Sequence, residues 1–81
     1  MNKIVAVQIN NRRQNSTKVQ EVLTNNGCVI SGRIGLHEAK NVCSSEGLIV
    51  LILNGKKEEI TKLITELENI NEVTINEMGL E

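Results

Sequence analysis

The spacing of apolar residues changes several times along the chain. Residues 3–10 alternate between the two sides of an extended chain, which predicts a strand whose buried face carries Val5, Val7 and Ile9. After a polar stretch, apolar residues recur at helical spacing at Val19, Val22 and Leu23. We expect this helix to be capped by one of residues 15–17 and to end at Gly27, because glycine adopts a left-handed backbone without a Cβ penalty.

A second strand is predicted over residues 28–36. Its alternation places Cys28, Ile30, Ile34 and Leu36 on the buried face, which leaves Arg33 on the opposite face or at an interface. Residues 37–46 form a polar connection. Residues 48–53 are apolar on both faces, as in a central strand.

The last third of the chain predicts a helix and a strand. The helix begins after Asn54-Gly55 and has Glu58 and Glu59 in its first turn, where the helix dipole favours anions. Its apolar stripe has the spacing i, i+3, i+4, i+7: Ile60, Leu63, Ile64 and Leu67. A half-buried strand follows at residues 72–78.

The resulting order, βαββαβ, predicts an α+β, ferredoxin-like fold. In this fold the antiparallel sheet has the order 4-1-3-2 and both helices lie on one face. Strands one and three are then central, which fits their being the most apolar. With 81 residues, we expect one domain over residues 1–81.

The second face of this sheet needs a cover. The central strands carry apolar residues on both faces, and two helices cover only one of them. We therefore expect the chain to form a homodimer or homotetramer through its open sheet face.

Composition removes several classes of function. The chain has no aromatic residue, so RNA-recognition motifs and other base-stacking modules are excluded, and a net charge of −1 argues against direct nucleic-acid or membrane binding. It has no Asp for a calcium loop or a Walker-type magnesium site. Two cysteines without a CxxC pair, and a start with no signal-peptide pattern, predict a reduced cytoplasmic protein in which Cys28 is a small buried apolar residue.

Two segments are candidates for a binding site. Gly32 and Gly35 flank Arg33 within a strand, so they could admit a small anion beside exposed N–H groups, with Arg33 as its counter-ion. The alternative is a β-bulge with a solvated arginine. Asn10, Asn11 and Arg12 precede the first helix, whose N-terminus attracts anions, although a solvated connection also explains them.

A metal or redox site is the competing interpretation. His37 and Cys43 could provide an imidazole and a thiolate, but their spacing matches no established zinc signature. The same pair lacks an orienting third group for nucleophilic catalysis. We therefore expect no enzyme activity and no cofactor, and a ligand-free interaction module remains a further alternative.

Four segments together resemble the iron-only hydrogenase system regulators, which are small bacterial proteins: residues 10–12, 18–27, 28–36 and 60–73. The resemblance covers about residues 3–79, and its most specific part is Gly32-Arg33-Ile34-Gly35. It implies a stand-alone ACT-like regulatory domain that acts in transcriptional regulation. Such domains typically pair through their sheets and bind small effectors at subunit interfaces, which would place Asn10, Asn11, Arg12 and the 32–35 segment near a site.

The same resemblance extends distantly to the C-terminal domain of nickel-responsive regulators. Those proteins use several histidines and a cysteine, with a separate DNA-binding unit. This chain has one histidine and no such extension, so nickel binding is not carried over.

Overall fold

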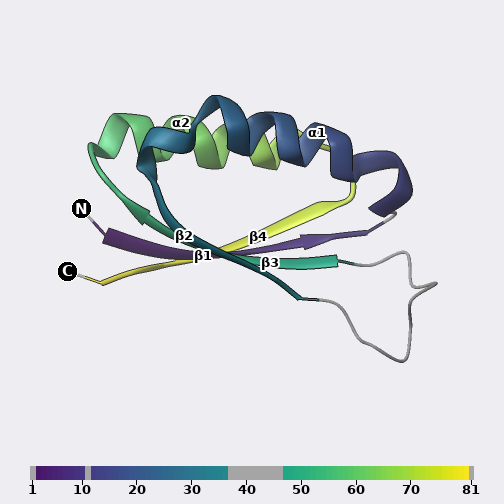
Figure 1. Cartoon of the computed structure of the whole chain (residues 1–81), viewed down its shortest axis with the longest axis horizontal. Helices are drawn as coiled ribbons and strands as arrows, with labels where there is room; N and C mark the ends of the chain where they lie inside the picture. The colour runs from purple at the N-terminus through teal and green to yellow at the C-terminus, as the bar shows by residue number, and fades with distance from the viewer. Residues whose placement is uncertain (1, 11, 37–46, 81) are drawn as a thin grey trace.

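The computed structural model describes residues 2–10, 12–36 and 47–80. Its strands pair in the order β2-β3-β1-β4, and all neighbours are antiparallel. Both helices lie on one side of the sheet (Figure 1), as the sequence predicts. The elements are β1 (Asn2–Ile9), α1 (Arg12–Asn25), the 3₁₀ turn η1 (Gly27–Val29), β2 (Ile30–Leu36), β3 (Gly47–Asn54), α2 (Lys57–Glu68) and β4 (Val73–Gly79).

The hydrophobic core lies between the helices and the sheet. Each helix contributes the stripe that its spacing predicts, and β1 and β3 contribute alternate residues. Every core residue is Val, Ile or Leu, and burying each such side chain contributes about 1.5–3 kcal/mol. The core residues are Val5, Val7, Ile9, Val19, Leu23, Val29, Ile49, Leu51, Leu53, Ile60, Leu63, Ile64 and Leu67. No helix in the described ranges is long and apolar enough to cross a membrane.

Helix α1 begins earlier than predicted. It starts at Arg12 and includes Asn15, which we expected to be a capping candidate. Asn15 is instead buried, and its Nδ2 donates a hydrogen bond to the carbonyl oxygen of Asn10 at 3.2 Å. This hydrogen bond joins α1 to the residue that follows β1.

Helix α1 also ends differently from the prediction. Gly27 does not have a positive φ, so it is not a left-handed C-terminal cap. The side chain of Asn26 caps the helix, since its Nδ2 donates to Val22 O at 2.8 Å and to Glu66 Oε1 at 2.9 Å. Lys62 Nζ donates to Asn26 Oδ1 at 3.4 Å, so this cap also joins α1 to α2.

Strand β2 contains a β-bulge that reverses the predicted faces. Ile30 lies opposite Leu53, but Gly32, not Ser31, lies opposite Ile52. Ser31 is thus an extra residue, and every residue after it points to the other side of the sheet. The prediction that Arg33 faces away from the core was therefore wrong. Arg33 lies opposite the buried Leu51, on the helix face.

Ile34 takes the position on the open face that was predicted for Arg33. It lies opposite Val50 and is 55% exposed. Leu48, Ile52 and Met78 are also exposed. Because Ile52 and Met78 both lie opposite Ile4, these residues share the face away from the helices. This confirms that the second face of the sheet is apolar.

Gly55 precedes α2 in a backbone conformation that disfavours other residues. Its φ is +151°, and a Cβ there would lie 3.1 Å from Val29 Cγ1. Gly55→Ala should therefore lower the free energy of unfolding by about 1–3 kcal/mol, measured by urea denaturation. Gly27→Ala is the matched control, because no described heavy atom lies within 4 Å of its Cβ position and stability should not fall. Equal losses in both variants would contradict this assignment.

The bulge makes deletion of Ser31 a test of the β2 register. Without Ser31, β2 would alternate regularly and keep Arg33 on the helix face and Ile34 on the open face. We expect the variant to fold cooperatively, with a Tm within a few degrees of wild type. Deletion of Val50 is the control, since it would reverse the faces of half of a central strand and unfold the protein. Unfolding of both variants would overturn the register.

Candidate functional site

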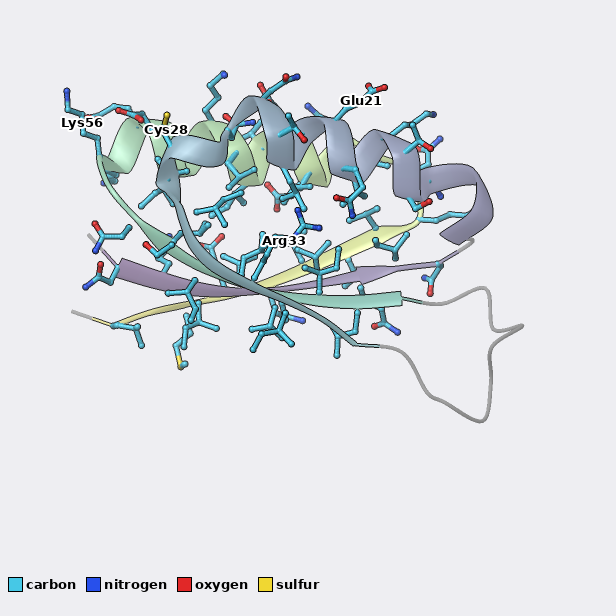
Figure 2. All side chains as sticks on the ribbon, in the orientation of Figure 1. Glu21, Cys28, Arg33 and Lys56 are labelled. Carbon is cyan, nitrogen blue, oxygen red and sulfur yellow. The ribbon has the colours of Figure 1, made fainter. Side chains whose placement is uncertain are left out.

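Arg33 lies between the edge strand β2 and helix α1. Figure 2 shows its side chain on the helix side of the sheet. Its Nη2 donates a hydrogen bond to Gln20 Oε1 at 2.8 Å, and both residues are exposed. A guanidinium has five N–H donors in a planar fork, so Arg33 can bind a carboxylate or phosphate while Gln20 fixes its orientation.

Gln20 is the residue that sequence reasoning missed. We expected the helix to be capped by one of residues 15–17, close to Gln20, but α1 begins at Arg12. Gln20 therefore lies in the middle of the helix, opposite Arg33. Nothing in the sequence pairs residues 20 and 33, because their contact depends on the bulge.

The two glycines of the candidate segment lie on opposite faces. Gly35 lies opposite the buried Ile49 on the helix face, and no described heavy atom lies within 4 Å of its Cβ position. A side chain at this position would therefore meet no described atom close to the backbone. Gly32 lies on the open face, where its Cβ position is 3.6 Å from Ile52 Cδ1.

Asn10 is held at the end of β1. Its N–H donates to the carbonyl oxygen of Glu72 at 2.8 Å, and its own carbonyl accepts from Asn15. Glu72 has a φ of 64°, a conformation that costs free energy in a non-glycine residue. From the strand register, Asn10 lies on the order of 20 Å from Arg33, so one small ligand cannot contact both residues of the same chain.

The remaining candidates fall partly outside what the structure describes. Asn11, His37 and Cys43 lie outside the described residues. Arg12 is the first residue of α1, and only its backbone is described. Within the described ranges, no three potential ligands group as a metal site.

Helix α1 and strand β2 together define the candidate site. They run antiparallel, so the first turn of α1 lies at the end of the sheet where β2 reaches Gly35. Arg33 and Gln20 lie further along, and Arg12 begins α1 about 12 Å from Gln20 along the helix axis. We define the α1–β2 site as Gln20, Arg33 and Gly35. Arg33 gives this site its positive charge, at one end.

A second surface depression is a weaker candidate for ligand binding. It lies on α2 and is lined by Lys57, Glu58, Thr61, Lys62, Thr65 and Glu66. All of these come from one helix, and the acids offset the lysines, so the depression carries no clear preference for a ligand charge.

The prediction that Cys28 is buried was wrong. Cys28 is an exposed, free thiol in the turn η1, before β2 begins (Figure 2). Val29, the next residue, is the one that enters the core, at 3% exposure. The 3₁₀ turn replaces the predicted first residues of the strand, and with them the predicted burial of Cys28.

The fold places the chain among the small α+β, ferredoxin-like domains. Its sequence matches, over residues 2–77, the family described as "TM1266-like: Iron-only hydrogenase system regulator, putative". The match covers nearly the whole chain, so the protein belongs to this family. No curated protein matches the sequence.

Solved structures agree on the fold. The chain is similar to the uncharacterized protein TM1266 from Thermotoga maritima, with a TM-score of 0.86 and 22% identity over 99% of this chain and 96% of the other. It also resembles CPII, a nitrogen regulatory PII-like protein from Thiomonas intermedia K12 that was solved with ADP, AMP and bicarbonate. There the TM-score is 0.59 and the identity 11%, over 99% of this chain and 90% of that one. At these identities, the likeness concerns the fold alone.

Exposure of Cys28 predicts a fast thiol reaction in the native protein. In a Cys43→Ser variant, Cys28 should react with DTNB without denaturant, at a rate close to that of a small free thiol. The double variant Cys28→Ser/Cys43→Ser provides the blank. A reaction that required urea would show that this thiol is protected.

Proposed function

We propose that this protein is a cytoplasmic regulatory module of an iron-only hydrogenase system, that it binds a small anionic effector, and that it acts as a homo-oligomer. The family assignment supports a regulator and gives no support to an enzyme. The effector proposal rests on the α1–β2 site. There Arg33 is oriented by Gln20 beside the open space at Gly35.

The charge of Arg33 sets the chemical class of the effector. A planar guanidinium pairs most strongly with a carboxylate or a phosphate, through two parallel hydrogen bonds. The start of α1 adds the positive end of a helix dipole at the Gly35 end of the site, and Arg12 and Arg13 add positive charge to that first turn. An effector with one anionic group at each end of a short chain or ring would use both features.

The proposal gives a different role to three other candidate residues, Asn10, Asn11 and Gly32. Asn10 lies on the order of 20 Å from Arg33 within one subunit, and Gly32 faces the opposite side of the sheet. We propose that these residues contribute at the border of a site completed by another subunit. The α1–β2 site is the part that each subunit supplies alone.

The regulatory mechanism we propose is thermodynamic linkage. An effector that binds one assembly or conformation more tightly than another shifts the population toward the first, by an amount set by its differential affinity. The protein needs no DNA-binding element of its own for this mechanism, because the assembled form can act on a partner regulator.

An Arg33→Ala variant tests the effector site. The probes are inorganic phosphate, AMP, ADP, bicarbonate, and amino acids with acidic side chains; three of these are named with the PII-like neighbour. A probe at one hundred times its Kd stabilises the folded state by about 2.7 kcal/mol, which raises the Tm of a chain this size by roughly 10–20 °C. Arg33→Ala should abolish that shift, measured by differential scanning fluorimetry with an extrinsic dye.

A control variant distinguishes the loss of a positive charge from the loss of the effector site. Lys18→Ala removes an exposed cation from α1 and should keep the full Tm shift. Arg33→Ala should leave the Tm without ligand nearly unchanged, because the Arg33–Gln20 hydrogen bond is exposed. An effector whose Tm shift survived Arg33→Ala, or no Tm shift of the wild type with any probe, would count against the site.

A further inference from the structure

The chain contains two Asn-Gly pairs, Asn26-Gly27 and Asn54-Gly55. An asparagine followed by glycine is especially prone to spontaneous loss of its side-chain amide, because a residue without a Cβ lets its backbone nitrogen approach the asparagine side chain. The two pairs are alike in sequence, but their surroundings in the fold differ. This difference decides which of the two asparagines can react in the native protein.

Asn26 is held in place at the end of α1. Its Nδ2 donates to Val22 O at 2.8 Å and to Glu66 Oε1 at 2.9 Å. Its Oδ1 accepts from Lys62 Nζ at 3.4 Å, and the residue is only 9% exposed. An attack by the nitrogen of Gly27 requires the Asn26 side chain to rotate, which breaks these bonds and leaves polar groups of both helices unpaired. The fold therefore protects Asn26.

Asn54 has the opposite surroundings. It is the last residue of β3, its side chain is exposed, and it lies on the open face of the sheet, opposite Asn2. No hydrogen bond to another described residue holds this side chain. Gly55 follows the end of the strand, and local opening of the backbone is easiest at the ends of elements. The side chain and the next peptide unit can therefore approach each other without disrupting the core.

We infer that Asn54 is a site of spontaneous deamidation in the folded protein and that Asn26 is not. The backbone nitrogen of Gly55 loses its proton to solvent base and attacks Asn54 Cγ. A bond forms between this nitrogen and Cγ, the Cγ–Nδ2 bond breaks, and the amide group takes up a proton from water and leaves as ammonia. Lys56 and the N-terminal end of α2 follow directly, and they favour the negative charge on the attacking nitrogen.

The reaction ends with the addition of water. Water opens the five-membered ring at one of its carbonyl carbons, which gives aspartate or isoaspartate at position 54. One water is consumed for each ammonia released, and no oxidant, reductant or cofactor takes part. Neither product returns to asparagine, because the ammonia has been lost.

Both products change the open face of the sheet. The new carboxylate is ionised at neutral pH, whereas the described strand residues that share this face with Asn54 carry no charge. Isoaspartate also lengthens the backbone just before Gly55, whose Cβ position lies 3.1 Å from Val29 Cγ1. The charge of the open face therefore depends on the age of the molecule.

Peptide mapping of incubated protein compares the two asparagines in one sample. Trypsin, used at mildly acidic pH where ring closure is slow, places them in different peptides, residues 19–33 and 41–56. Deamidation raises the mass of a peptide by about 1 Da, and fragmentation assigns the change to a residue. In the native protein Asn54 should react faster than Asn26 by a factor on the order of 30 or more, because Asn26 must first break its hydrogen bonds. In guanidinium chloride, where both are unfolded, the two rates should be similar.

Asn54→Gln is the matched control. It keeps an exposed amide, but its longer side chain would have to close a larger ring, so the 41–56 peptide should gain no mass. Circular dichroism checks that the variant has the fold of the wild type. Similar rates at Asn26 and Asn54 in the native protein would overturn the inference, as would a native Asn54 that stays unchanged while the denatured chain reacts. A mass gain that persists in Asn54→Gln would assign the reaction to Asn41 and would also overturn it.

Discussion

The presence of apolar residues on both sides of β1 and β3 is the constraint on which the rest of the structure depends. Two helices supply enough apolar surface for one face of four strands, and they form an entirely aliphatic core there. The same central strands leave Ile4, Val50 and Ile52 on the other face. The chain therefore folds around one core while it retains a second apolar surface, and most of its charge is kept on the side of the helices.

The bulge at Ser31 decides which face each later residue of β2 occupies. If Ser31 were paired in regular alternation instead of being bulged, Arg33 would lie on the open face, where a cation would oppose apolar association. With the bulge, Arg33 meets Gln20 beside α1, and Ile34 joins the exposed apolar residues of the open face. Arg33 and Ile34 are thus neighbours in the chain but lie on opposite sides of the sheet. Arg33 could bind an effector on the helix side, and Ile34 could meet a second copy on the open side.

The strands, helices and sheet order were predictable because they depend on periodic apolar residues, and those residues form the core. The errors occur where one local interaction replaces a periodic rule. The alternation of apolar residues does not reveal a bulge, so Arg33 was assigned to the wrong face. Side-chain hydrogen bonds of Asn15 and Asn26 moved the ends of α1 from their predicted positions. The turn η1 replaced the predicted start of the strand and exposed Cys28. Arg33 and Gly35 were predictable as site residues, but Gln20 and its pairing with Arg33 required the fold.

The position of β2 at the edge of the sheet gives effector binding and self-association a common physical basis. Among the described strands, β2 pairs only with β3, so it is held by fewer neighbours than β1 or β3. An anion bound by Arg33 would restrain β2 from the helix side, and a second copy against Ile34 would restrain it from the other. Restraint by one partner lowers the conformational entropy lost on binding the other. Linkage then requires that effector binding strengthen self-association by the same factor as self-association strengthens effector binding.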